Sequence, residues 1–193
     1  MVKIHLSWPF VAAVPALVFF DREYRLTVMF LSALIHEAGH IFAIAYRKIP
    51  IESICLGICG ANINYGKNRL TSYSDDIFIA LMGAAFNFAA IGAAMAADRL
   101  WDVNCDFFIG VNTLFGVFNL APVLPLDGGR AFYASIAKLF SENAAFLILK
   151  ILGTVAGVLG CCIGVLLLIK SKGNFTLLLI SSAVLTANLS DTG

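Results

Sequence analysis

The sequence has few charged residues, and this scarcity excludes a soluble domain of ordinary composition. Charged residues make up 13% of the 193 residues, whereas soluble globular domains carry about 25%. Hydrophobic residues make up 60%, and the mean hydropathy is +0.90. A chain this apolar, at a length typical of one domain, is predicted to be an integral membrane protein with a single domain over residues 1–193.

The sequence also has no large excess of positive or negative charge, and its cysteines show no pattern typical of a disulfide framework. The formal net charge is +1, so nothing indicates a nucleic-acid partner or a charged tail. The five cysteines form no C-x-x-C pair, and Cys161 and Cys162 lie inside an apolar run. This pattern predicts buried free thiols and implies no disulfide framework.

Long apolar runs are the main feature of the chain. They predict membrane spans over residues 7–20, 26–46, 77–97, 107–121, 144–169 and 175–189, the fourth with a broken continuation over 127–140. The predicted fold class is an all-α polytopic membrane protein with about six transmembrane helices. With both termini inside, the inner loops hold six Lys and Arg residues and the outer loops five. The positive-inside rule therefore favours this orientation.

The stretch that follows the second run has a different pattern. Residues 51–65 are too few to span as a helix, and residues 61–65 alternate apolar and polar side chains. Alternation of this kind predicts strands, so we expect a short membrane-associated β-hairpin over 51–65. The hairpin either offers an edge to which an extended substrate adds, or is an ordinary connection between two spans.

Residues 36–40 read His-Glu-Ala-Gly-His and hold the strongly ionisable side chains of the second run. On a helix, His36 and His40 share one face, so both imidazoles can reach one metal ion. Glu37 is the next residue around the helix from His36, at the position where a zinc half-site would have its general base. A carboxylate at membrane depth costs on the order of 3 kcal/mol, so a partner must offset it. The alternative is a pair of structural histidines held by neighbouring helices.

Residues 119–130, with the sequence NLAPVLPLDGGR, break the fourth run. Pro122 and Pro125 cannot both lie in an intact helix, because proline lacks an N–H and clashes with the preceding turn. Asp127 follows this break with apolar sequence on both sides, whereas the other aspartates lie in loops, at span ends or near the terminus. Asp127 is therefore the carboxylate predicted to be the third metal ligand.

With the Gly83-to-Asn87 element of the third run, these two motifs resemble the site-2 protease family of intramembrane zinc metalloproteases. The compact layout is most similar to the bacterial stage IV sporulation FB-type subgroup, which cleaves the precursor of a sporulation sigma factor. The resemblance implies that His36, His40 and Asp127 bind one Zn²⁺ per chain and that Glu37 activates the attacking water. It also implies that Asn119 and Pro122 hold the substrate. Asn87 either packs between helices, with a hydrogen bond across the contact, or belongs to the substrate-binding group with Asn119 and Pro122.

The expected function is hydrolysis of a peptide bond in or near a transmembrane segment of a membrane-bound substrate. That substrate is a sigma-factor precursor or a regulatory membrane protein. The expected partners are this segment, the lipid bilayer and, as an open option, a regulatory membrane protein. The expected location is the bacterial cell membrane, with the active site open toward the cytoplasm. Two alternatives are a catalytically silent family member that binds membrane clients and a metal transporter.

Overall fold

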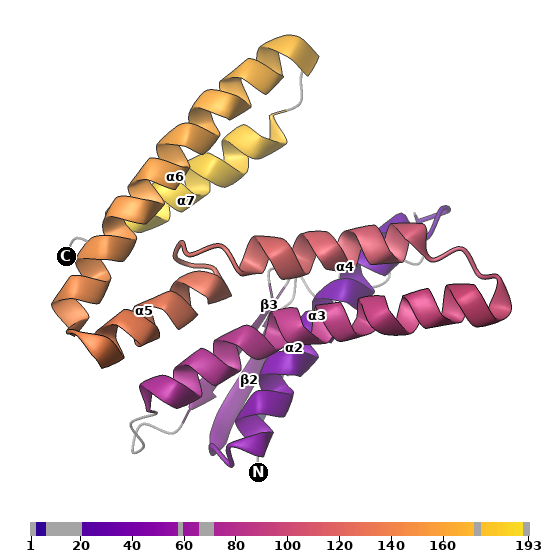
Figure 1. The fold of residues 1–193 in the computed structure, drawn as a ribbon, viewed down its shortest axis with the longest axis horizontal. Helices are drawn as coiled ribbons and strands as arrows, with labels where there is room; N and C mark the ends of the chain where they lie inside the picture. The colour runs from indigo at the N-terminus through magenta and orange to yellow at the C-terminus, as the bar shows by residue number, and fades with distance from the viewer. Residues whose placement is uncertain (1–2, 7–20, 58–59, 66–71, 172–174, 191–193) are drawn as a thin grey trace. The chain divides into compact units, whose positions relative to one another are not determined.

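The computed structural model describes residues 3–6, 21–57, 60–65, 72–171 and 175–190, and Figure 1 traces their elements. The chain forms two compact units, Met1–Asn119 and Leu120–Gly193, here called unit 1 and unit 2. Each unit is described by itself. The predicted first span, residues 7–20, lies outside the described residues.

The described part of unit 1 contains three helices, α2 (Arg25–Tyr46), α3 (Tyr73–Trp101) and α4 (Asp106–Asn119). Helix α3 begins one turn before the predicted run, because the Ser72 side chain accepts a hydrogen bond from the Asp75 backbone N–H and caps the helix. Helix α4 has 14 residues, which gives a length of about 21 Å. This is shorter than the roughly 30 Å hydrocarbon core of a bilayer.

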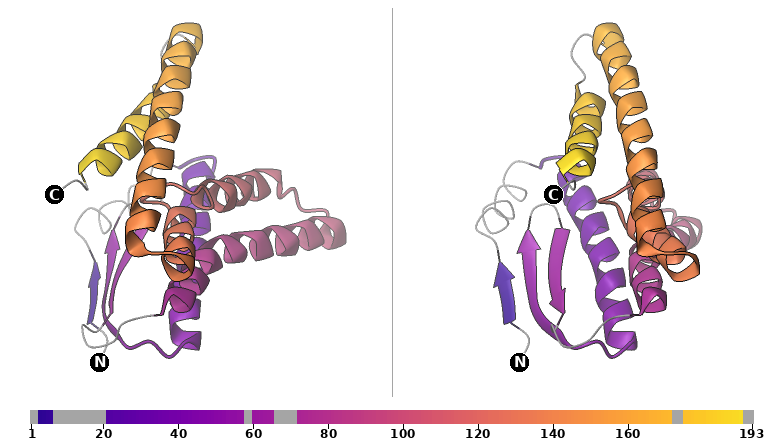
Figure 2. Two further views of the ribbon diagram at one scale, coloured as in Figure 1. Left: turned by 60° about the vertical axis from the view of Figure 1, so that its left-hand side comes forward. Right: turned by 90° about the vertical axis from the view of Figure 1, so that its left-hand side faces the viewer.

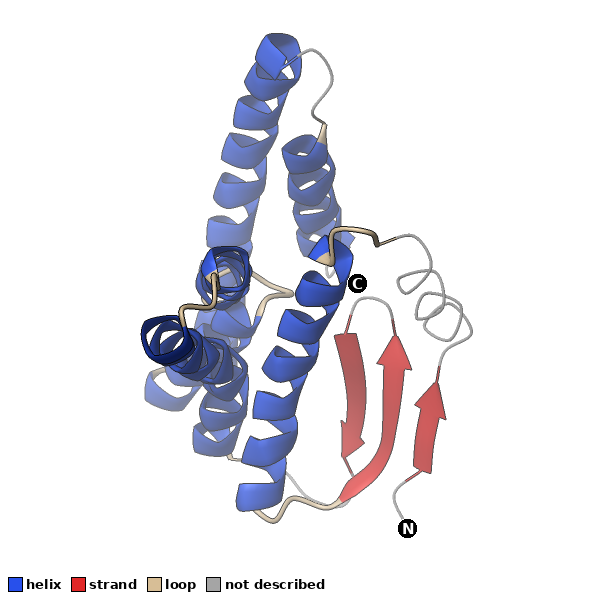
Figure 3. Cartoon of the chain, turned by 90° about the vertical axis from the view of Figure 1, so that its right-hand side faces the viewer, coloured by secondary structure: helices blue, strands red, loops and turns tan. Residues whose placement is uncertain are grey.

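A three-stranded sheet completes unit 1, with strands β1 (Lys3–Leu6), β2 (Ile51–Gly57) and β3 (Gly60–Tyr65) in the order β1-β2-β3. β2 and β3 pair antiparallel, with Ile54 opposite Ile63, and β1 pairs parallel with β2. β3 contacts α2, and Figure 3 shows the sheet beside this helix. The predicted strands over 51–65 are thus present in the structure, whereas β1 was not predicted. Association of the hairpin with the membrane stays a prediction.

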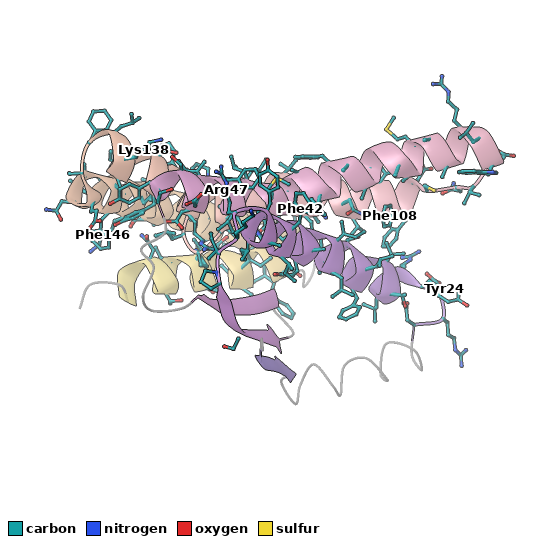
Figure 4. The ribbon with its side chains drawn as sticks, turned by 90° about the horizontal axis from the view of Figure 1, so that it is seen from below. Tyr24, Phe42, Arg47, Phe108, Lys138 and Phe146 are labelled. Atoms are coloured by element: carbon teal, nitrogen blue, oxygen red, sulfur yellow. The ribbon has the colours of Figure 1, made fainter. Side chains whose placement is uncertain are left out.

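Helices α2 and α3 pack closely at one end through aromatic and small side chains. Tyr24 and Arg47 mark the two ends of α2, and Phe42 lies near its C-terminal end (Figure 4). The rings of Phe42 and Phe86 are 5.4 Å apart between centroids. At Gly39 a Cβ atom would collide with the Met82 backbone carbonyl of α3. The absence of a side chain at Gly39 therefore permits the close approach of the two helices.

Unit 2 contains α5 (Asp127–Leu139), α6 (Glu142–Ser171) and α7 (Thr176–Ser190). Lys138 on α5 and Phe146 on α6 are labelled in Figure 4. Helices α6 and α7 lie side by side (Figure 2). Glycines at four positions of α6 face α7: Gly153, Gly157, Gly160 and Gly164. Such small residues let two helices approach closely in a bilayer.

Three described helices, α2, α3 and α6, are long and apolar enough to cross a membrane. Large apolar side chains cover their outer surfaces, including Met95 at 58% and Leu166 at 59% exposure. An exposed apolar surface of this extent fits lipid better than water. These helices indicate an integral membrane protein, while a total of six spans stays a prediction.

Candidate metal centre

His36 and His40 of α2 bring their ring nitrogens to one point. Four residues separate them, so they lie on the same face of the helix. Both side chains are buried, with 5% and 7% exposure, and their Nε2 atoms are 3.2 Å apart. The rings stand nearly perpendicular, with centroids 4.8 Å apart. The predicted convergence of the two imidazoles on one face of α2 is therefore present in unit 1.

The other nitrogen of each ring is held by a hydrogen bond that sets the tautomer. His40 Nδ1 lies 2.8 Å from the Ile79 backbone oxygen, which can only accept, so Nδ1–H donates. His36 Nδ1 lies 2.7 Å from Asn87 Oδ1. The Asn87 amide is oriented by its Nδ2, which donates to the Ser32 backbone oxygen at 3.1 Å. Asn87 therefore presents its oxygen to His36, and His36 Nδ1–H is also a donor.

This arrangement has the chemistry of a metal-binding pair. When each ring is neutral and its single proton is on Nδ1, both Nε2 atoms carry lone pairs directed to the same point. One cation can bind two such lone pairs 3.2 Å apart, and its charge offsets their mutual repulsion. Metal-ligating histidines commonly donate their second N–H to a carbonyl or carboxylate oxygen in this way. The residues present thus fit a divalent metal that takes nitrogen ligands, such as zinc.

Glu37 follows His36 directly on α2 and is half-buried. One residue along a helix corresponds to about 100° of rotation, so its carboxylate leaves the helix beside the histidine face. A carboxylate in this place can take a proton from a water molecule next to the histidine pair.

Gly83 of α3 faces the two imidazoles, and a side chain there would occupy the space next to both Nε2 atoms, where a metal ion would bind. A Cβ atom at Gly83 would lie 2.6 Å from His40 Nε2 and 2.7 Å from His36 Nε2, shorter than a carbon–nitrogen contact allows. This position of α3 therefore requires glycine, which has no side chain.

We expect Gly83→Ala to raise the dissociation constant for zinc at least about 10-fold, as loss of ligand orientation does. The matched control is Gly92→Ala on the same helix, where an added Cβ meets nothing within 4 Å. Zinc affinity is measured by competition with a chelator in purified protein. Equal affinities for the two variants would contradict the assignment of Gly83 to the metal position.

Asn87 is fully buried, at 0% exposure, and both ends of its amide are hydrogen-bonded. Its Nδ2 also donates to Asn112 Oδ1 on α4, at 2.8 Å. Asn112 donates in turn to Ser32 Oγ at 2.9 Å. Asn112 and Ser32 were not identified from the sequence. Asn112 was identifiable, because an amide inside an apolar run seldom lies there without a hydrogen-bonding role.

In unit 2, Asp127 is the first residue of α5, which begins directly after the proline-containing break. Its side chain is 12% exposed, and one oxygen lies 3.7 Å from Arg130 Nη1. A carboxylate at this position also interacts favourably with the positive end of the helix dipole. Gly128 and Gly129 leave no room for a Cβ, because the backbone at Leu120 and Val123 folds back against them. The break predicted from the two prolines thus turns the chain tightly and presents Asp127 at a helix start.

The two remaining predicted residues lie next to this break. Asn119 ends α4 and donates from Nδ2 to the Phe115 backbone oxygen at 3.0 Å, and Pro122 is exposed. Their substrate-binding roles, and that of Asn87, stay predictions. The structure brings His36, His40 and Asn87 together within unit 1. Asp127 and Pro122 belong to unit 2, so their roles beside the histidines are part of the proposed function.

Comparison with known proteins points to one group of enzymes. No protein-family model matches the chain. A zinc metalloprotease of Methanocaldococcus jannaschii is 26% identical over 117 residues, which cover 58% of this chain and 34% of that protein. A protein of Synechocystis sp., provisionally named a zinc metalloprotease, is 28% identical over 162 residues, covering 79% of this chain and 42% of that protein. The chain thus spans well under half the length of these curated relatives.

A solved structure matches the whole chain. The site-2 protease from Methanocaldococcus jannaschii superposes with a TM-score of 0.64 and 22% identity, covering 100% of this chain and 91% of that one. The match shows that the chain has the fold of a site-2 protease. The names of the relatives support a zinc metalloprotease. Similarity to the sporulation-type subgroup stays a prediction.

Proposed function

We propose that the chain is an intramembrane zinc metalloprotease of the site-2 protease family, with one zinc ion held by His36, His40 and Asp127. The observation that carries the proposal is the buried pair of Nε2 atoms 3.2 Å apart, each on a ring whose Nδ1 is held by a hydrogen bond. Two imidazoles and one carboxylate, which these residues supply, are a donor set that could hold one metal ion. Three protein ligands leave one coordination position open, as in catalytic rather than structural zinc sites.

The chemistry assigned to Glu37 is general acid–base catalysis. A zinc ion bound here supplies Lewis acidity, which lowers the pKa of water and polarises a peptide carbonyl. Glu37 takes a proton from the water as its oxygen attacks the carbonyl carbon. When the carbon–nitrogen bond breaks, Glu37 delivers this proton to the leaving amine, so the carboxylate is regenerated. The Nδ1 hydrogen bonds of His36 and His40 keep both rings oriented during the reaction.

The proposed substrate is a membrane-bound protein that is cleaved in or near its transmembrane segment. Helical segments hide their carbonyl groups in hydrogen bonds, so the substrate must be locally extended. β3 lies at one edge of the described sheet, and an extended segment could pair with such an edge. Asn119 and Pro122 are proposed to hold the segment near the break before Asp127. Sigma-factor precursors and regulatory proteins of a bacterial cell membrane are the two substrate classes, with cleavage on the cytoplasmic side.

Metal removal tests the proposal. We expect the full chain in lipid nanodiscs to contain about one zinc per chain, as a mononuclear catalytic site requires, and to cleave a single-span reporter. Treatment with 1,10-phenanthroline is expected to abolish cleavage, and added Zn²⁺ to restore it, whereas added Mg²⁺ leaves it absent because magnesium prefers oxygen ligands. Cleavage that persists in zinc-free protein would contradict the proposed function. Zinc binding without cleavage of any reporter would favour a silent, client-binding protein.

A further inference from the structure

We propose that Asn112 and Ser32 are positioning residues of the metal centre, which act on His36 through the Asn87 amide. This inference rests on the proposed function, because it assumes that His36 binds zinc. It concerns three polar side chains on three different helices: Ser32 on α2, Asn87 on α3 and Asn112 on α4. All three have 0% exposure.

The three side chains form one closed hydrogen-bond network. Asn112 Nδ2 donates to Ser32 Oγ at 2.9 Å and to the Phe108 backbone oxygen at 2.9 Å. Ser32 Oγ donates to the Val28 backbone oxygen at 2.9 Å. Asn112 Oδ1 accepts from Asn87 Nδ2 at 2.8 Å. Every donor in the network therefore meets an acceptor.

These contacts leave each amide one orientation. Phe108 contributes a backbone oxygen, which can only accept, so the nitrogen of Asn112 must face it. The oxygen of Asn112 then faces Asn87 and requires a donor, which is Asn87 Nδ2. The oxygen of Asn87 is left facing His36 Nδ1 at 2.7 Å. Through these steps Asn112 helps to select the His36 tautomer that directs Nε2 toward the metal position.

The network residues on α2 and α3 lie on the same helix faces as the histidines and Gly83. Ser32, His36 and His40 follow one another at intervals of four residues, so they share one face of α2. Gly83 and Asn87 have the same spacing on α3, and Gly83 faces both imidazoles. Ser32 therefore lies on the same face of α2 as the two histidines, and Asn87 lies on the face of α3 that is turned toward them. Asn112 forms hydrogen bonds to both Ser32 and Asn87.

Helix packing alone does not require such a network. Apolar side chains of similar volume would fill the same space without the desolvation cost of two amides and a hydroxyl. Within the described residues no buried side-chain nitrogen or oxygen lacks a partner, so the cost is offset only while the network is complete. A fully satisfied buried network specifies one arrangement of its members. Here the last hydrogen bond of the network joins Asn87 to Nδ1 of His36, a proposed metal ligand.

The test is Asn112→Leu, measured by the affinity of the full chain for zinc and by the visible absorption spectrum of bound Co²⁺. We expect the zinc dissociation constant to rise about 10- to 100-fold, which is typical when an outer hydrogen-bond partner of a metal ligand is lost. The Co²⁺ spectrum, which reports ligand geometry, is expected to change. Ser32→Ala removes a single oxygen and is expected to weaken zinc binding in the same direction by a smaller factor. It serves as the test if Asn112→Leu does not fold.

The matched control is Asn188→Leu in α7. Asn188 is also a buried amide, and it donates two hydrogen bonds, to the Lys150 backbone oxygen and to Thr154 Oγ1, both at 2.9 Å. Its loss should lower thermal stability while the zinc affinity and the Co²⁺ spectrum stay those of the wild type. Equal effects of Asn112→Leu and Asn188→Leu on zinc affinity would overturn the inference, because they would reveal a general loss of stability.

A double variant tests the route through Asn87. If Asn112 acts only through Asn87, then Asn112→Leu should change zinc affinity less than about 2-fold in an Asn87→Ala background. Additive effects of the two substitutions would overturn this route.

Wild-type zinc affinity in Asn112→Leu and Ser32→Ala would overturn the inference while the proposed function stands. A wild-type protein that binds no zinc would overturn the proposed function first, and this inference with it.

Discussion

Replacing Glu37 with glutamine is expected to abolish cleavage while the zinc stays bound. The amide has nearly the same size as the carboxylate but cannot take a proton from the attacking water. Loss of general-base catalysis reduces rates by about 10²- to 10⁴-fold. His36 and His40 keep their hydrogen bonds to Asn87 and to the Ile79 backbone oxygen, so metal affinity should not change.

The measurement is the single-turnover cleavage rate of the reporter together with the zinc content of the same sample. Glu23→Gln is the control, because this carboxylate is 71% exposed and forms an ion pair with Arg25. The control should keep both the rate and the zinc. A Glu37→Gln variant that cleaves within about 10-fold of the wild-type rate would remove Glu37 from the role of general base.

Asp127→Ala is expected to weaken zinc binding by more than about 100-fold, beyond the range seen for outer-shell residues, because it removes one of three proposed ligands. Cleavage should fall with the zinc content and should return only in part at high zinc concentration. The two histidines remain and retain weak binding.

Asp106→Ala separates this loss from a general effect on helix stability. Asp106 is the first residue of α4, as Asp127 is of α5. Each carboxylate interacts with the N-terminal end of its helix, a contribution of about 0.3–1 kcal/mol. Both variants should therefore lose similar stability, whereas Asp127→Ala alone should lose zinc. Zinc affinity in Asp127→Ala equal to that in Asp106→Ala would exclude Asp127 as a ligand.

Local sequence patterns predicted the parts of the fold that depend on local physics. Helix α2 covers the apolar run at 26–46, and the four-residue spacing of His36 and His40 was enough to expect their convergence. The start of α3 was predicted four residues late, because its first turn contains Asp75 and Asp76 and lies outside the apolar run. The Ser72 cap, rather than hydrophobicity, determines where this helix begins.

Features that depend on distant contacts could not be predicted in this way. Strand β1 has four residues, and it pairs with a strand about fifty positions later, Lys3 lying opposite Ser53. So short a stretch carries little periodic signal of its own. The hydrogen bond from His36 to Asn87 spans 51 residues and depends on how α2 and α3 cross at Gly39. A single sequence contains the two residues but not the crossing that joins them.

The division of the chain into two units bears on the order in which the metal centre is made. Both histidines, Glu37 and the amide network that holds His36 lie before residue 120, within unit 1. Proteins are synthesised from the N-terminus, and units formed first can fold first. On the ribosome, the proposed nitrogen ligands and their hydrogen-bond partners thus emerge before the proposed carboxylate ligand. Asp127 follows only eight residues after Asn119, the last residue of unit 1, so this proposed third ligand is among the first residues of unit 2.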